Sequence, residues 1–296
     1  MFKVAGYVAF AMLLAGAAFW WITTPERVRE NDIAGLAGDA VRGEAAFWAG
    51  GCASCHSAPG AEGDERLVLS GGRAFASDFG TFYAPNISPD PVYGIGDWQA
   101  ADLVNAMRHG TAPGGDHYYP AFPYTSYARA SLQDMVDLWA FLQTLPASTV
   151  PDTPHEVGFP FSLRRLLGGW KFLFTGPDQV VAGDLPPEAA RGRTLAEGLG
   201  HCGECHSPRN ALGGIDYTRW LAGAPNPSGK GRIPNITPGK LDWSVADLVE
   251  YFTSGFTPDY DSAGGEMAEV VQNLAKLPIE DRRAIAAYLK AVPAVE

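Results

Sequence analysis

The chain has 296 residues, of which 46% are hydrophobic and 19% charged, so its composition is that of a folded protein with room for two domains and not of a disordered chain. Its formal net charge of −11 at pH 7 excludes general electrostatic attraction to nucleic acid and favours partners with basic surfaces.

The N-terminus begins with an apolar segment. Residues 4–24 are 21 uncharged, mostly apolar residues, enough for a helix to cross the ~30 Å hydrocarbon core of a bilayer. Trp20 and Trp21 suit the far interface of such a helix. A cleaved signal peptide is the alternative, because residues 15–17 (AGA) satisfy an A-x-A cleavage site. We expect residues 1–30 to be an uncleaved membrane anchor, or else a signal sequence, and the body of the protein to be exported to the periplasm.

All four cysteines lie in two C-x-x-C-H motifs, CASCH and CGECH. The motif residues are Cys52, Cys55 and His56, and Cys202, Cys205 and His206. In such a motif both thiols add to haem vinyl groups, and the short turn places the following imidazole under the iron. Zinc sites and thioredoxin-type pairs do not require a histidine directly after each pair. The sequence therefore predicts two covalently attached haem c groups, with His56 and His206 as fifth iron ligands and no spare thiol.

The chain is also an internal duplication. In each copy, apolar residues recur every three to four positions and the run ends at glycine or proline, which predicts helices. The sequence has no sustained period-2 alternation of the kind that indicates strands. The expected fold is therefore all-α. The matched segments are 42–56 with 191–206, 84–90 with 233–239, 97–110 with 242–255, and 132–146 with 279–293.

The segment between the copies belongs to neither. Its second part, FSLRRLLGGWKFLFTGP, is short, apolar and basic, with Arg164, Arg165 and Lys171. One interpretation is an interfacial membrane segment. The interpretation that we favour is a connector whose aromatic side chains pack between the two copies, with Gly168-Gly169 breaking any helix.

Both C-x-x-C-H motifs, together with PNISPD, YYPAFPYTSYARAS and GGEMAEVV, give the chain a family resemblance. It resembles the dihaem class I cytochromes c and, more loosely, the membrane-bound cytochrome c subunits of periplasmic alcohol, sugar and aldehyde dehydrogenases. The resemblance covers nearly everything after residue 35. It implies two tandem cytochrome c domains, at 35–148 and 186–296, joined by a connector at 149–185 behind an N-terminal transmembrane helix.

The family pattern implies Met267, in GGEMAEVV, as the sixth ligand of haem 2. A thioether is a soft ligand suited to iron, and histidine–methionine ligation raises the haem potential. In the first copy, Phe122 stands in the methionine's place, since Gly110 to Phe122 and Gly255 to Met267 both span twelve residues. Phenylalanine cannot coordinate iron, so the family pattern provides no sixth ligand for haem 1.

Three interpretations of haem 1 remain open. We favour His117 as its sixth ligand, which would give a bis-histidine haem of lower potential. Other ligand candidates are Met107, His109 and Met135. In the third interpretation the iron is five-coordinate and Phe122 covers an empty pocket.

Three further polar residues are candidates for supporting roles. Arg73 is either the partner of a haem propionate or an ordinary surface arginine. Asn86 and Asn235, each in a Pro-Asn-Ile turn, either pin a loop over a haem by hydrogen bonding or simply form the turn.

These features predict a membrane-anchored, periplasmic dihaem cytochrome that passes electrons from a dehydrogenase or quinol-oxidising donor to a downstream cytochrome or oxidase. The enzymatic alternative is a dihaem peroxidase-like protein with an open haem 1, and a third possibility is an obligate subunit of an oxidoreductase complex. We assign no catalytic residue outside the haems and expect no nucleic-acid partner. With His117 as its ligand, haem 1 should have the lower potential and receive electrons first.

Overall fold

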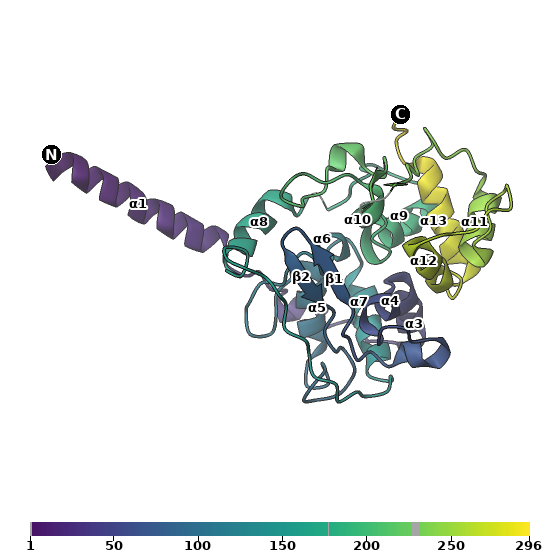
Figure 1. Cartoon of the computed structure of the whole chain (residues 1–296), viewed down its shortest axis with the longest axis horizontal. Coiled ribbons are helices and arrows are strands. Elements are labelled where there is room, and N and C mark those ends of the chain that lie inside the picture. The colour runs from purple at the N-terminus through teal and green to yellow at the C-terminus, as the bar shows by residue number, and fades with distance from the viewer. Residues whose placement is uncertain (1, 177, 227–230) are drawn as a thin grey trace.

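A computed structural model describes residues 2–176, 178–226 and 231–296 of the chain. Its first helix, α1 (Phe2–Ile22), projects alone from a compact helical body (Figure 1). The stretch Lys3–Ile22 has a mean hydropathy of 1.7 and none of it is buried, and among the described residues it is the one helix long and apolar enough to span a membrane. A signal sequence would meet the same criterion.

The body begins with the elements of the N-terminal half, which we define as residues 35–148, preceded by the short α2 (Glu30–Ile33). A long loop separates its haem-motif helix from its later helices. Its elements are α3 (Ala40–Ala49), α4 (Cys52–His56), η1 (Gly63–Leu67), β1 (Ala74–Ser77), β2 (Gly80–Tyr83), α5 (Ala100–His109), α6 (Tyr124–Tyr127) and α7 (Leu132–Leu142).

The C-terminal half, defined as residues 186–296, repeats this order, with a π-helical turn (η2) continuing its first helix. Its elements are α9 (Pro187–Arg193), η2 (Thr194–Leu199), α10 (Gly203–His206), η3 (Tyr217–Arg219), β3 (Ala224–Pro225), β4 (Arg232–Ile233), α11 (Val245–Ser254), α12 (Glu266–Leu274) and α13 (Ile279–Ala291).

The Arg-Gly pair near the start of each repeat explains how the first helix crosses the closing helix. A Cβ atom on Gly43 would lie 2.0 Å from the carbonyl oxygen of Asp137 in α7, so only glycine permits this approach. Arg42 then donates from Nε to the Asp137 carboxylate at 2.7 Å. In the second half Gly192 and Arg191 meet α13 in the same way.

The core of each half lies at this helix crossing. Phe47 in α3 is fully buried and Leu138 in α7 is 2% exposed, while Leu199 and Tyr288 are fully buried at the corresponding crossing of the second half. Burial of each such side chain contributes about 1.5–3 kcal/mol relative to leaving it in water. The closing helices therefore fix the position of the haem motifs that follow α3 and η2.

The expectation of an all-α fold needs correction at two places, although the structure is predominantly helical. Strands β1 and β2 pair antiparallel, with Ala74 opposite Tyr83. Strands β3 and β4 form a second, shorter antiparallel pair. Strands of four and two residues are too short to produce a sustained alternation, so the sequence pattern did not indicate them.

The connector also contains a helix, α8 (Leu166–Phe174), where Gly168-Gly169 was expected to break one. Figure 1 shows α8 lying across the end of α1, between that helix and the body. A Cβ atom on Gly168 would lie 2.7 Å from the Cα atom of Thr23, so the glycine allows α8 to approach the end of α1. Gly168 therefore allows close contact between two helices, and the Gly168-Gly169 pair does not interrupt α8.

Candidate haem sites

Each motif histidine is held by its Nδ1 atom. His56 Nδ1 lies 2.9 Å from the carbonyl oxygen of Pro85, and His206 Nδ1 lies 2.8 Å from that of Pro234. A carbonyl can only accept, so Nδ1 is the protonated nitrogen and Nε2 keeps its lone pair. Burial lowers the pKa of both imidazoles, which further favours the neutral form that binds a metal.

The carbonyl that orients each histidine is itself positioned by the asparagine of the same turn. Asn86 Nδ2 donates to the carbonyl oxygens of Ser148 and Val150, at 2.8 Å each. Asn235 Nδ2 donates to the Val295 carbonyl at 2.8 Å. Both asparagines also accept a backbone N–H two residues on, so they form the turn and pin it to the tail of their half at once.

The motif cysteines lie in or directly before the short helices α4 and α10. Burial raises the pKa of Cys52 to about 12 and that of Cys202 to about 12. Within the described residues, no group of three or more His, Cys, Asp and Glu side chains is gathered as a metal site. Two thiols and one oriented imidazole per helical turn fit a covalently attached haem better than a zinc ion.

The hairpins that precede Phe122 and Met267 have the same backbone. Tyr118 N donates to Gly110 O at 2.8 Å, and Ala263 N donates to Gly255 O at 2.8 Å. The bridges Thr111–His117 and Phe256–Ser262 also correspond. Phe122 and Met267 therefore follow equivalent hairpins at equal distance, which confirms the correspondence expected from the twelve-residue spacing.

The two equivalent positions have different surroundings. Phe122 packs among three tyrosines, with ring centroids 5.8 Å from Tyr118, 6.5 Å from Tyr124 and 5.4 Å from Tyr127. Met267 lies half-buried in the first turn of α12, after Gly265 with a φ of 57°. The first half thus offers an aromatic cluster where the second offers a thioether.

The structure does not bring His117 to this position. His117 pairs with Thr111 across the hairpin and corresponds to Ser262, not to Met267. Its Nε2 lies 3.0 Å from the carbonyl oxygen of Thr23, at the end of α1, and its Nδ1 lies 2.9 Å from Lys171 Nζ. Both ring nitrogens therefore have protein partners in this arrangement, and neither is free for an iron.

The other candidate ligands of haem 1 are also engaged by the protein. Met107 and Met135, 3% and 0% exposed, lie in the hydrophobic core formed with α3 and α7. His109 Nδ1 lies 3.4 Å from a carboxylate oxygen of Glu26, just after α1.

The two halves exchange contacts between their haem motifs and the helices that follow their hairpins. In α6, directly after Phe122, Thr125 and Ser126 donate to the Glu204 carboxylate at 3.3 and 2.5 Å. Glu204 is the residue before the second cysteine of CGECH. Figure 1 shows α6 beside α10 accordingly.

The reverse contact joins α12 to the first motif. Asn273 Nδ2 donates to Ser54 Oγ at 2.8 Å, and Ser54 occupies in CASCH the place that Glu204 has in CGECH. Arg73 Nη1 donates to the Ser54 carbonyl at 2.5 Å and to Glu269 of α12 at 2.8 Å. Arg73, considered above as a propionate partner or surface residue, thus joins the two halves.

His201, which no sequence motif indicated, lies directly before the second haem motif and contacts the segment that precedes the first. It precedes Cys202, interacts with the backbone of Gly50, and its ring centroid is 5.7 Å from that of Tyr127. Burial lowers its pKa. Like Glu204 and Asn273, it contacts residues far away in sequence, and no local pattern would have revealed it.

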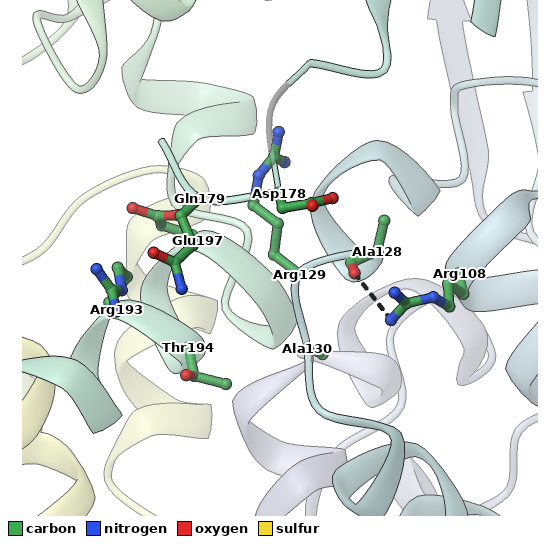
Figure 2. A pocket seen from close by; sticks show the side chains of 9 residues that line it. All are labelled: Arg108, Ala128, Arg129, Ala130, Asp178, Gln179, Arg193, Thr194 and Glu197. Atoms are coloured by element: carbon green, nitrogen blue, oxygen red, sulfur yellow. Dashed lines mark hydrogen bonds between the residues drawn. The ribbon is translucent and has the colours of Figure 1, made fainter. Parts of the chain in front are cut away.

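A cavity of about 250 Å³ also lies between the halves (Figure 2). It is polar, but several of its polar groups are committed to the surrounding structure. Arg108 donates to the Ala128 carbonyl at 3.4 Å, and Glu197 accepts from the backbone N–H groups of Val180 and Val181 at 2.7 and 2.9 Å. The bonds of Glu197 therefore join the connector to the body at the edge of the cavity. Its lining residues are Arg108, Ala128, Arg129, Ala130, Asp178, Gln179, Arg193, Thr194 and Glu197.

Comparison with known proteins identifies the family. A cytochrome c family model matches residues 40–146. A dihaem c-type cytochrome of Cereibacter sphaeroides is 64% identical over 285 residues, which cover 96% of each chain. The fructose dehydrogenase cytochrome subunit of Gluconobacter japonicus and the gluconate 2-dehydrogenase cytochrome c subunit of Pantoea cypripedii are each 38% identical over 86% of this chain.

The chain spans only part of these two dehydrogenase subunits, 52% and 59% of their lengths. The relatives named here are cytochromes and cytochrome subunits, and they give the peroxidase-like alternative no support. The chain belongs to the dihaem c-type cytochromes and carries two covalently bound haem c groups.

Proposed function

We propose that the chain transfers electrons from a dehydrogenase to a downstream cytochrome or oxidase, on the periplasmic side of a membrane in which α1 anchors it. The haems supply the one-electron redox chemistry, while the protein sets their potentials and docks the partners. The observation that carries this proposal is that each haem motif is contacted by the other half, Glu204 by Ser126 of α6 and Ser54 by Asn273 of α12. These contacts support a transfer of electrons between the haems because they hold the two attachment segments together.

The proposal includes two tandem cytochrome c domains, 35–148 and 186–296, joined by the connector 149–185. His56 and His206 are the proposed fifth ligands, supported by their Nδ1 contacts. Met267 is the proposed sixth ligand of haem 2, supported by its hairpin and its place at the start of α12. The thioether links are proposed at Cys52, Cys55, Cys202 and Cys205.

For haem 1 we propose a five-coordinate iron, with Phe122 at the sixth position. The contacts of His117 with Thr23 and Lys171 favour this over the bis-histidine haem expected above. A methionine ligand raises the haem potential, so haem 1, which has none, should lie below haem 2. Electrons would then enter at haem 1 and leave from haem 2.

Carbon monoxide tests the ligation directly. In optical spectra of the reduced protein we expect about half of the haem to bind carbon monoxide, since a vacant ferrous iron takes an exogenous ligand and a methionine-ligated one does not do so readily. EPR of the oxidised protein should show one high-spin and one low-spin haem. Absence of carbon monoxide binding, with two low-spin signals, would overturn the proposal for haem 1.

Potentiometry tests the direction of transfer. The two haems should titrate as separate waves, with the carbon monoxide-sensitive haem at the lower potential. A carbon monoxide-sensitive haem at the higher potential would reverse the proposed direction.

A pull-down from native membranes tests the partner. The names of the dehydrogenase cytochrome subunits above support a dehydrogenase as donor. Recovery of a dehydrogenase that reduces the cytochrome on addition of its substrate would support the proposal. Recovery of the cytochrome without any such protein would count against an obligate complex.

A further inference from the structure

The segment from residue 159 to the end of α8 exposes an unusual number of large apolar side chains. Phe172 is 70% exposed and Leu173 is 65% exposed. Scattered apolar residues are normal on a protein surface, whereas a contiguous group marks a contact with another phase or another molecule. The exposed members are Phe159, Phe161, Leu163, Leu166, Phe172 and Leu173.

Helix α8 has one face turned to the body and one turned away from it. On the inner face, the Trp170 ring lies 6.4 Å from that of Tyr124, and Trp170 Nε1 donates to the Leu212 carbonyl at 2.8 Å. On the outer face, a Cβ atom on Gly169 would meet no atom within 4 Å, and Phe172 is exposed beside it. The role of connector expected from sequence therefore explains only the inner face of α8. It does not explain why the outer face is apolar.

Helix α8 is fastened to the end of α1. Arg165 donates to the Trp20 carbonyl at 2.6 Å and to Thr23 Oγ1 at 2.7 Å. Its guanidinium also lies 4.1 Å from the centroid of the Trp20 ring. These contacts and the close approach at Gly168 place α8 at the level where α1 ends.

We infer that α8 and the preceding apolar loop are a second membrane-contact element, whose outer face lies in the headgroup boundary of the bilayer that α1 crosses. The inference rests on the proposed anchoring by α1. A helix that crosses the hydrocarbon core ends at the interface, so a helix fastened across that end lies along the interface. The occupant of the apolar face is a lipid surface, because that face adjoins the spanning helix itself.

A second contact point has a functional consequence. One spanning helix leaves the body free to rotate about the helix axis, whereas a second contact fixes that rotation. The haem-bearing body would then present a constant side to its redox partners.

Nitroxide labels measure the position of each surface in the full-length holoprotein, reconstituted in phosphatidylcholine–phosphatidylglycerol nanodiscs. The four native cysteines are used by the haems, so a single introduced cysteine is the only free thiol. Three separate variants are compared: Phe172→Cys on α8, Leu13→Cys within α1, and Tyr260→Cys, which is 90% exposed in the loop between α11 and α12. Figure 1 shows α11 and α12 at the end of the body opposite α1.

We expect oxygen, which concentrates in lipid, to relax the label at residue 172 several-fold more than aqueous nickel chelate does, with the opposite result at residue 260. A water-like label at 172 beside a lipid-like label at 13 would overturn the inference and leave the anchoring intact. A water-like label at 13 would overturn the anchoring and the inference with it. A label at 172 shielded from both reagents would indicate a protein contact and would also overturn the inference.

Two neighbouring glycines test the fastening in the same assay. With the label at residue 172, Gly168→Val should shift α8 away from the end of α1 and reduce the lipid-like signal. Gly169→Val is the matched control, because its side chain would meet open space, and it should leave the signal unchanged. An unchanged signal in Gly168→Val would show that contact with α1 does not position α8.

Discussion

The two hairpins that precede Phe122 and Met267 share a backbone but differ in what covers them. In the first, Thr111 is fully buried and His117 is 3% exposed, beneath Lys171 of α8 and the end of α1. In the second, Phe256 is 53% exposed. The glycine at each hairpin's start, with a positive φ in both halves, sets the shared geometry. The neighbours then decide whether a hairpin is covered by α8 and the end of α1 or presented at the surface.

The largest effect is expected from Met267→Phe, which places after the second hairpin the residue that follows the first. Haem 2 should lose its sixth ligand, so its potential should fall, by on the order of 100 mV within the ~0.8 V range that axial ligands cover. Both haems should then bind carbon monoxide. Val270→Phe, a partly exposed position on the same helix, is the control and should leave the spectrum unchanged.

The converse variant, Phe122→Met, supplies the first hairpin with a thioether. We expect carbon monoxide binding to be largely lost and the potential of haem 1 to rise, by on the order of 100 mV at most, since the surrounding tyrosines must also adjust. Redox titration and carbon monoxide difference spectra measure both effects. Unchanged carbon monoxide uptake would mean that position 122 does not face the iron.

Asn86→Ala and Asn235→Ala compare the turns that orient the two histidines. A buried carbonyl that loses its donor costs about 1–3 kcal/mol, and a partly buried one costs less because water can replace the donor. Asn86 holds two carbonyls and Asn235 holds one, so urea unfolding should show the larger loss of stability in Asn86→Ala. Equal losses would indicate that the turn itself, and not its attachment, carries the stability.

The smallest expected effect is the share of the pH dependence of stability that His117, in the first hairpin, contributes. Burial lowers the pKa of His117, so unfolding at acid pH takes up a proton there. The free energy of unfolding should therefore fall as pH decreases through about 6.5, the ordinary pKa of histidine. His117→Gln should remove this share of the dependence, measured by urea unfolding on either side of that pH. Identical pH slopes in both proteins would contradict the assignment.

The sequence allowed the parts of the sites that are local to be predicted. The C-x-x-C-H motifs predict both attachment points and one ligand within five residues, and the apolar spacing in each repeat predicted the helices around them. The equal spacing to Phe122 and Met267 was equally readable, because a glycine-initiated hairpin repeats its geometry.

What could not be predicted depends on contacts between distant residues. His117 was a reasonable ligand by residue type, but its partner Thr23 is 94 residues away. The contacts of Glu204 with α6 and of Asn273 with α4 likewise arise only when the two halves pack. The only local sign was a charged residue at 204, where the first motif has Ser54.

These exchanged contacts have a consequence for the history of the chain. A duplicated unit that touches its copy only through a linker can be separated again, by fission of the gene, without loss. Here the motif helix of each copy is contacted by the other copy, through Glu204 in one direction and Asn273 in the other. Separation of the two copies would therefore leave these polar side chains without their partners, at a cost that a pair joined only by a linker would not have.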